Sequence, residues 1–320
     1  MIERGISVGK ALNRHQAGLP SLALMSASVL WGAGFVLAKI ALSELTVLQT
    51  VACRFAVGSI ALGVASGCAW RRVGVADLSK LVVCGLLMVP VTYGLQFEGI
   101  RRLNASNAAV VSGVLPALLA VSGIIMLRER SCWRTWAAIL LSIAGVFGIA
   151  RAEAIQAIHL GVIYVLASLV AITAWTLISK RLMERHSVLT TTFLSVLAGT
   201  VAALALALWA DGIPQVPSLE VTLAVVGSGL FCTAGAYGLW NWGLRRTSVG
   251  EASVFVNIET VTGVILGELI LRETLNARTI TGGVLVVAGA ALVGDSRSKK
   301  ARLDRSADES RGASASSAAG

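Results

Sequence analysis

The sequence predicts an all-helical membrane protein of ten transmembrane helices, arranged as two inverted five-helix repeats. Three observations predict this fold. The chain of 320 residues is 56% apolar and only 14% charged, with a mean hydropathy of +0.79, so a water-soluble fold could not bury its apolar surface. The apolar residues form long continuous runs. One half of the sequence repeats in the other half at a fixed offset.

Ten apolar runs follow one another along the chain, and each is close to the roughly 20 residues that a helix needs to cross a bilayer. They cover residues 20–42, 47–69, 78–100, 105–127, 133–150, 160–182, 188–210, 219–244, 249–271 and 277–294. The runs lack the alternation that is typical of a membrane barrel. Because hydrocarbon offers no partner to an unpaired backbone group, we expect one helix for each run.

The repeat has an offset of 144 residues, and it aligns Tyr93 to Ala150 with Tyr237 to Gly294 without a gap. Each copy contains five runs, an odd number, so the second copy must enter the membrane in the opposite orientation. Inverted repeats of this kind are typical of carriers that work by alternating access. The clearest identities are Tyr93-Gly-Leu with Tyr237-Gly-Leu, Arg101-Arg102 with Arg245-Arg246, Leu127-Arg-Glu129 with Leu271-Arg-Glu273, and Trp31 with Trp175.

Charge fixes the expected topology. The net charge is +10, and 20 of the 27 Lys and Arg residues fall in segments on the same side as the N-terminus, against five on the other side. By the positive-inside bias, both termini are expected in the cytoplasm of a cell whose inner membrane holds the chain. The basic charge therefore does not indicate a nucleic-acid partner. We expect a cytoplasmic N-terminal tail (1–18), a first repeat (19–150), a second repeat (151–294) and a disordered cytoplasmic tail (295–320).

Several local motifs occur in a familiar order. Trp31-Gly-Ala-Gly lies in the first run and Arg54-Phe55 in the second, and the second half contains Asn257-Ile-Glu-Thr and Leu271-Arg-Glu. Over residues 20–294 the chain resembles the drug/metabolite transporter superfamily, in its ten-helix EamA-like branch. The resemblance implies a secondary carrier, most often an exporter, of small organic metabolites such as amino acids or their derivatives. That family often has Glu-Pro in its ninth helix, where this chain has Glu259-Thr260.

Charged residues inside the runs are the first candidates for transport, because a charge near the bilayer centre costs about 2.5 to 3.5 kcal/mol on insertion scales. Glu259 lies about ten residues into the ninth run. It is either a coupling or substrate-contacting carboxylate, or a structural group bonded to a neighbouring helix. Lys39, Arg54 and Glu98 lie near the ends of their runs, where they form either a gate or long side chains that reach the interface. Arg54 is the strongest of these three.

The repeat supplies a second criterion for a solute site. Tyr93, Gln96 and Phe97 have i, i+3, i+4 spacing and share one helix face. Aromatic rings mixed with an amide are typical of a solute pocket, although ordinary packing and interfacial aromatic belts use the same residues. The images of this face at the repeat offset, and a further related tryptophan pair, complete the predicted substrate-binding set: Tyr237, Trp240, Asn241, Trp31 and Trp175.

The sequence shows no set of residues that is typical of an enzyme active site. The three histidines and five cysteines show no metal-ligand spacing, and no Gly-x-x-x-x-Gly-Lys-Ser/Thr loop is present, so a solute or ion gradient must supply the energy. We expect no cofactor and no metal. The predicted partners are a small-molecule substrate and the lipid bilayer, and a homodimer is compatible with the sequence. The alternatives are a multidrug exporter for cationic lipophilic compounds and, in a different class, an intramembrane enzyme or a scaffold.

Overall fold

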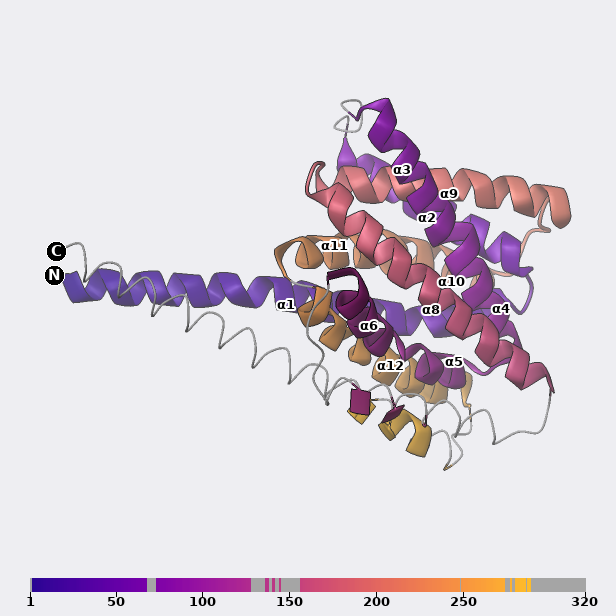
Figure 1. Cartoon of the computed structure of the whole chain (residues 1–320). Helices are drawn as coiled ribbons and strands as arrows, with labels where there is room; N and C mark the ends of the chain where they lie inside the picture. Colours follow the sequence, from indigo (N-terminus) through magenta and orange to yellow (C-terminus); the bar gives the residue numbers. More distant parts are fainter. Residues whose placement is uncertain are drawn as a thin grey trace.

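The computed structural model describes residues 2–67, 73–127, 136–137, 140–141, 144, 156–247, 249–273, 277, 280–285 and 287–288. Every regular element in these ranges is a helix (Figure 1). The predicted all-helical class is therefore confirmed. The predicted tail 295–320, most of the fifth run and half of the tenth run lie outside the described residues.

Each described run corresponds to one or more helices. Six helices in the described part of the chain are long and apolar enough to cross a membrane. The first repeat comprises α1 (Ile2–Ala41), α2 (Val47–Ser66), α3 (Val75–Leu86), η2 (Leu87–Tyr93), α4 (Gly94–Arg102), α5 (Ala105–Ser112) and α6 (Leu115–Leu127). The second comprises α8 (Gln156–Met183), α9 (Val188–Ala210), α10 (Leu219–Gly227), η3 (Ser228–Gly235), α11 (Ala236–Arg246) and α12 (Val249–Leu271).

The two ends of the bundle are marked by the loops 42–46 and 184–187, which we call the 42–46 face and the 184–187 face. Helix α9 begins directly after the 184–187 loop. Its far end reaches the other loop, because Thr46 Oγ1 donates to Asp211 Oδ2. At 1.5 Å per residue, this helix separates the two faces by about 35 Å. Since α1 ends at the 42–46 face and its repeat mate α8 ends at the 184–187 face, these mates run in opposite directions.

Packing follows the same inverted symmetry. Helix α1 packs on α11 as α8 packs on α4, and α2 packs on its own repeat mate α9. Both related contacts depend on a glycine. A Cβ on Gly99 would lie 2.5 Å from Val165 Cγ2, and one on Gly243 would lie 2.7 Å from Leu24 Cγ. Those separations leave no room for a side chain, which explains why this glycine occurs in both copies.

The fourth run corrects one expectation, because it forms two helices instead of one. Helix α5 ends at Ser112 and α6 starts at Leu115, with a turn between them. Pro116 explains the break: it has no N–H to donate to the carbonyl of Ser112, and its ring would collide with that carbonyl in a continuous helix. Its repeat mate is Thr260, and there α12 is continuous. The proline interruption therefore lies in the first repeat of this chain.

The third and eighth runs each contain a π-helical segment that their apolar pattern does not predict. Segment η2 contains Pro90 and ends at Tyr93. Segment η3 ends two residues before Tyr237, the repeat mate of that tyrosine. A π-helical turn shifts every following side chain around the helix axis relative to an ideal α-helix. Both segments therefore change the direction in which the two tyrosines point.

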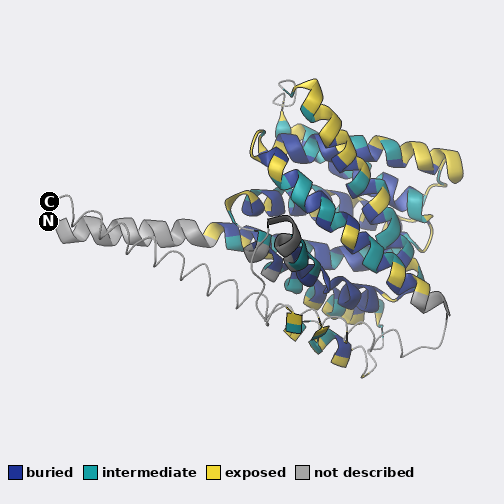
Figure 2. Ribbon diagram, in the orientation of Figure 1, coloured by how far each residue is buried: buried dark blue, intermediate teal, exposed yellow. Residues whose placement is uncertain are grey.

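Exposed side chains on the outside of the bundle are mostly apolar, whereas the interior is buried (Figure 2). Ile60, Val64 and Leu208 are more than half exposed. In water such a surface would aggregate. It fits the hydrocarbon of a bilayer, with polar and ionic contacts left to the interior and the two faces.

Candidate functional site

A narrow cavity lies in the interior between both repeats. Its volume is about 30 Å³, room for one or two water molecules. Two charged side chains are among its walls, and the rest are mainly aromatic or small. The lining residues are Trp31, Gly34, Phe35, Arg54, Thr92, Tyr93, Gln96, Phe97, Ile100 and Leu115 from the first repeat, and Ser168, Leu169, Ile172 and Glu259 from the second.

Tyr93 and Tyr237 meet at the repeat axis. Their hydroxyl oxygens are 2.6 Å apart in a buried hydrogen bond, although the residues are 144 positions apart in the sequence. Two copies of one position can touch only where the symmetry axis passes between them. The preceding π-helical segments η2 and η3 set this direction for both rings. The pair therefore marks the centre of the inverted repeat and one wall of the cavity.

Aromatic rings surround the tyrosine pair. Trp31 and Trp175, which are repeat mates, pack on Tyr237 from two sides, with centroid distances of 5.0 and 5.2 Å. Trp240 packs on Trp31 at 5.0 Å. On the cavity side, Phe97 packs edge-to-face on Tyr93 at 5.6 Å. Edge-to-face packing of this kind fixes ring positions and stabilises by about 0.5 to 1.5 kcal/mol for each pair.

Arg54 is almost completely buried at 2% exposure. Its Nε donates to Thr233 Oγ1 at 3.0 Å and its NH2 group donates to the carbonyl of Cys232 at 3.3 Å. Its guanidinium carbon also lies 4.8 Å from the centroid of Tyr93, within the range of a cation–π contact. The described residues give it no ion pair, so its charge is oriented but not neutralised.

Glu259 reaches the same cavity from α12 and is 8% exposed. It adjoins a close helix contact, because a Cβ on Gly32 would lie 2.7 Å from the Glu259 carbonyl oxygen. No hydrogen bond to its carboxylate is observed from the described residues. A carboxylate and a guanidinium therefore line one small cavity without forming a direct pair.

The two charges break the symmetry of the repeat. At the repeat offset, Arg54 corresponds to Ala198 and Glu259 corresponds to Leu115. Leu115 also lines the cavity, so one related position contributes a carboxylate and the other an alkyl side chain. The inverted scaffold is shared by both halves, whereas the charged chemistry occurs once.

The structure separates the eight predicted substrate-binding residues into two groups. Trp31, Tyr93, Gln96 and Phe97 line the cavity. The others lie on the far side of the tyrosine bond: Tyr237, Trp240, Asn241 and Trp175 are buried there but are not in the cavity wall. A role in binding stays a prediction for both groups.

The predicted gating residues are also separated. Arg54 and Glu259 line the cavity, whereas Glu98 does not. Glu98 Oε1 lies 2.8 Å from Arg101 and 2.6 Å from Arg102 on its own helix. No contact joins it to Arg54 or Lys39 in the part of the chain that the structure describes. Its contacts are those of a local surface cluster, and gating by Glu98 remains only a prediction.

The 42–46 face is closed mainly by bonds to the backbone. Lys39 Nζ donates to the carbonyls of Ile100 and Leu103 at 2.9 and 2.6 Å, at the end of α4. Glu273 accepts from the N–H groups of Ala105 and Ser106 at 2.7 and 2.9 Å, at the start of α5. A cation at a helix C-terminus and an anion at a helix N-terminus both oppose the local helix dipole charge. The turn between α4 and α5 is thus held from both sides.

A further contact on this face joins the two repeats. Glu44 Oε2 accepts from the backbone N–H of Ser218 at 2.8 Å. Hydrogen bonds from Ser218 lower the pKa of the Glu44 carboxyl below its ordinary value. The loop between the first two helices is thereby attached to the start of α10. A fully exposed carboxylate makes a weak tie, because water competes for it.

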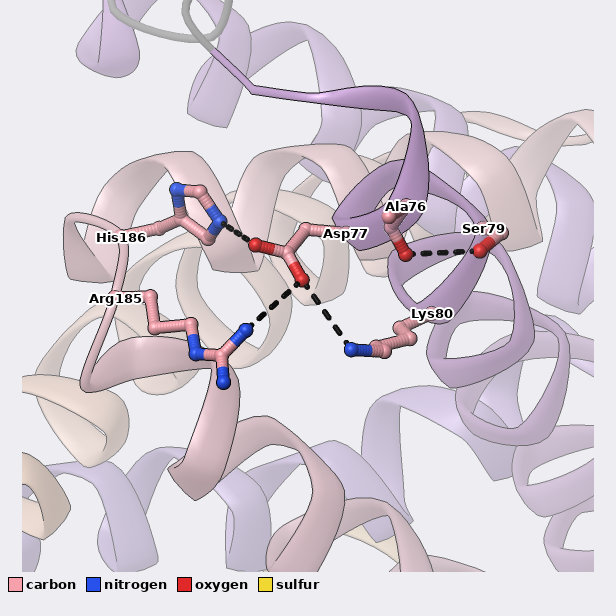
Figure 3. Close-up of polar contacts among 6 residues, drawn as sticks. All are labelled: Ala76, Asp77, Ser79, Lys80, Arg185 and His186. Atoms are coloured by element: carbon pink, nitrogen blue, oxygen red, sulfur yellow. Dashed lines mark hydrogen bonds and ion pairs between the residues drawn. The ribbon is translucent and has the colours of Figure 1, made fainter.

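The 184–187 face is closed by an ionic cluster centred on Asp77, near the start of α3 (Figure 3). His186 Nε2 lies 2.9 Å from Asp77 Oδ2. Lys80 and Arg185 lie 3.4 and 3.7 Å from Oδ1. Separately, Lys180 Nζ donates to the carbonyl of Thr247 at 2.7 Å, and Thr247 is the repeat mate of Leu103. A lysine therefore donates to the carbonyl of the related residue at each face, Lys39 to Leu103 and Lys180 to Thr247.

Two inverted sets of helices, an apolar exterior and a buried charged cavity at their axis define a polytopic membrane transport protein. The chain belongs to the EamA-like transporter family, whose model matches residues 19–151 and 159–294. This match confirms the family that the sequence motifs predict.

Individual relatives agree with this family. An "Uncharacterized transporter" of Archaeoglobus fulgidus is 27% identical over 82% of this chain and 94% of its own length. A "Probable terminal-alkyne amino-acid exporter" of Streptantibioticus cattleyicolor is 25% identical over 85% of this chain and 92% of its own length. A solved crystal structure with 19% identity has a TM-score of 0.66, covers 85% of this chain and 95% of that chain, and supports the fold alone.

Proposed function

We propose that this protein is a secondary exporter of small organic metabolites, of the amino-acid class, which works by alternating access. The observation that carries the proposal is the placement of Arg54 and Glu259 on one aromatic-walled cavity at the repeat axis. A guanidinium binds a carboxylate, and a carboxylate binds an ammonium group. Two opposite charges that do not pair with each other suit a solute that carries both.

Energetics support a functional reason for these charges. Each buried charge costs about 2.5 to 3.5 kcal/mol at a helix centre on insertion scales. Arg54 receives compensation from Thr233, Cys232 and the Tyr93 ring, whereas no described residue donates to the Glu259 carboxylate. Their repeat mates are the apolar residues Ala198 and Leu115, so the scaffold does not need a charge at either position.

The cavity is too small for the proposed solute, so the helices must move to open the site toward each face in turn. A space of about 30 Å³ cannot admit an amino acid, since it holds one or two waters. A solute enters only if helices separate at one face while the other stays closed. Inverted repeats supply two such states of similar energy, and the contacts at the 42–46 and 184–187 faces are the ones that must break in turn.

Direction and location complete the proposal. The relative in Streptantibioticus cattleyicolor is named as an exporter of an amino acid, which supports both the substrate class and export. The positive-inside bias supports an inner-membrane protein with both termini in the cytoplasm, which makes the 184–187 face cytoplasmic. A phosphatase fused after Gly294 should be inactive and a fluorescent protein fused there should fluoresce. An active phosphatase would overturn this orientation.

The site is tested with the whole chain in proteoliposomes that are loaded with an equimolar mixture of the twenty proteinogenic L-amino acids, and efflux is measured by mass spectrometry. We expect one or a few amino acids to leave faster than from protein-free vesicles. Glu259→Gln and Arg54→Gln should each reduce that efflux at least tenfold, because each removes one charged contact with the solute. Glu268→Gln is the matched control, since this carboxylate on the same helix is exposed and does not line the central cavity.

The same variants discriminate between an amino-acid exporter and an exporter of cationic lipophilic compounds. Glu259 among aromatic rings also suits a cation, but Arg54 opposes one. With ethidium as the probe, a cation exporter would lose transport in Glu259→Gln and gain it in Arg54→Gln. Parallel loss of amino-acid efflux in both variants supports the proposal. Efflux of ethidium but of no amino acid would overturn it.

A further inference from the structure

Three tryptophans form a cluster with Tyr237, and only Trp31 among them is also in the wall of the central cavity. Trp31 and Trp175 pack directly on its ring, and Trp240 packs on Trp31. All three side chains are buried, with exposures between 1 and 8%. Not one of their Nε1 atoms has a hydrogen-bond partner among the described residues. This aromatic cluster therefore contains three buried donors without a hydrogen-bond partner among the described residues.

An unused acceptor lies on the same helix as Tyr237 and Trp240. Asn241 is fully buried, one helical turn after Tyr237 on α11. Its Nδ2 donates to Thr192 Oγ1 at 2.8 Å, which fixes the orientation of the amide. Its Oδ1 is buried and has no partner in the described part of the chain. The amide is thus anchored by one end and presents a carbonyl oxygen at the other.

Packing alone does not account for these groups. A buried polar group without a partner is destabilising, and phenylalanine would supply an aromatic face without an N–H to satisfy. The concentration of such groups around one tyrosine points to a ligand or to water that occupies the region in another state of the protein. Trp240 and Asn241 lie toward the end of α11, so this region is on the 184–187 side of the tyrosine pair.

The repeat relates this region to the central cavity. At the repeat offset, Gln96 and Phe97 of the cavity wall correspond to Trp240 and Asn241, and Trp31 corresponds to Trp175. The two halves therefore carry related binding surfaces on opposite sides of the Tyr93–Tyr237 hydrogen bond. One surface has two charges, and the other has neutral donors and an acceptor.

We propose that Trp175, Trp240 and Asn241 form a second solute subsite, which is used when the 184–187 face opens. The indole N–H groups donate to the carboxylate of an α-amino acid, and Asn241 Oδ1 accepts from its ammonium group. The proposal rests on the proposed function for the class of solute. It adds that the solute meets neutral groups on the 184–187 side of the tyrosine pair and charged groups on the other side.

The test measures each face separately in right-side-out and inside-out membrane vesicles that contain the full chain. The probe is the mixture of twenty L-amino acids, and uptake of each is quantified by mass spectrometry. Labelling of Glu184→Cys or Ser43→Cys by a membrane-impermeant maleimide identifies which face is outside, so the result does not depend on the predicted topology. Apparent KM values are then compared between the two faces.

Trp240→Phe removes the N–H but keeps an aromatic ring, and Trp175→Phe provides a second, independent variant. Each should raise the KM for solute presented at the 184–187 face about tenfold, the effect of one lost hydrogen bond to a charged group. The KM from the 42–46 face should change less than twofold. Trp242→Phe is the matched control on the same helix, because its half-buried ring contacts Arg246 and lies outside this cluster.

Two results would overturn the subsite and leave the proposed function intact: equal KM changes at both faces, or a wild-type KM in both tryptophan variants while Arg54→Gln still blocks transport. A different result would overturn the proposed function and the subsite together: no uptake of any amino acid by wild-type vesicles of either orientation beyond the uptake by vesicles without the protein.

Discussion

The two faces of the bundle are closed by repeat-related elements with different chemistry. At the 42–46 face, Lys39 and Glu273 bind backbone carbonyls and N–H groups at helix ends. At the 184–187 face, the related loop contacts the start of α3 through an ion cluster of Asp77 with His186. The symmetry of the backbone therefore fixes where the two faces close. The individual side chains determine how stable each closed face is.

Backbone-directed contacts should contribute more stability than the partly exposed ion cluster. Glu273→Ala leaves two N–H groups at the start of α5 without an acceptor, next to the fully buried Ala105. We expect the free energy of unfolding to fall by about 2 to 3 kcal/mol, the range for a lost hydrogen bond to a charged group. Thermal unfolding in detergent micelles measures this, with the exposed Glu268→Ala as control. A larger loss in Asp77→Ala would reverse the ranking of the two faces.

The tyrosine pair tests whether the two halves are coupled at their axis. Tyr93→Phe leaves the Tyr237 hydroxyl buried without its partner, so we expect a loss of about 1 to 2 kcal/mol in unfolding free energy. Tyr237→Phe should cost a similar amount, and the double variant less than the sum of both. A coupling energy of about 1 kcal/mol in this double-mutant cycle would assign the effect to the bond itself. Strict additivity would contradict a direct hydrogen bond.

Some of this architecture is evident from the sequence, because the repeat relates each helix face in the first half to an equivalent face in the second half. Tyr93 and Tyr237 are found as equivalent positions, whereas their contact at the axis is known only from the structure. Glu259 and Arg54 stand out because charges are costly in apolar runs. Their position around one cavity was not predicted, because spacing alone placed Arg54 near the end of its run, at a gate or at the interface.

Other features leave a weaker trace in the sequence. The π-helical segments before both tyrosines arise from local backbone geometry inside an apolar run, so no period marks them. Pro116 is visible, but the apolar run continues past it and hides the break between α5 and α6. The Asp77–His186 contact joins residues 109 positions apart. Only the repeat relation between their loop and the 42–46 loop could have indicated it.

The ion cluster should determine how firmly the 184–187 face closes. Asp77 Oδ2 lies 2.9 Å from His186 Nε2, and its other oxygen faces Lys80 and Arg185. Removal of the Asp77 charge should therefore let this face open more often. Since the pair is about 17% exposed, we expect Asp77→Asn to cost about 0.5 to 1 kcal/mol, a two- to fivefold rise in the open population.

The measurement is the rate at which a single cysteine at Asn241, behind this face, reacts with a methanethiosulfonate reagent. Rates are normalised to a cysteine at Ser43 in the exposed 42–46 loop, which removes the intrinsic reactivity of the thiol and its dependence on pH. The normalised rate should be two- to fivefold higher in Asp77→Asn than in the parent. An unchanged rate would show that the ion cluster does not hold this face closed.

The smallest effect is expected at Glu44, and it completes the contrast between the faces. Because hydrogen bonds from Ser218 lower the pKa of this carboxyl, its contact is fully present above the ordinary pKa of a glutamate, about 4.3. It is lost only as pH falls through the lower value of the folded protein. Opening of the 42–46 face should therefore be independent of pH between 6 and 8, in the parent and in Glu44→Gln. The same reaction rate, measured at a cysteine in place of Gln96, checks this. A change of more than twofold across that pH range would show that the 42–46 face contains a contact that titrates between pH 6 and pH 8.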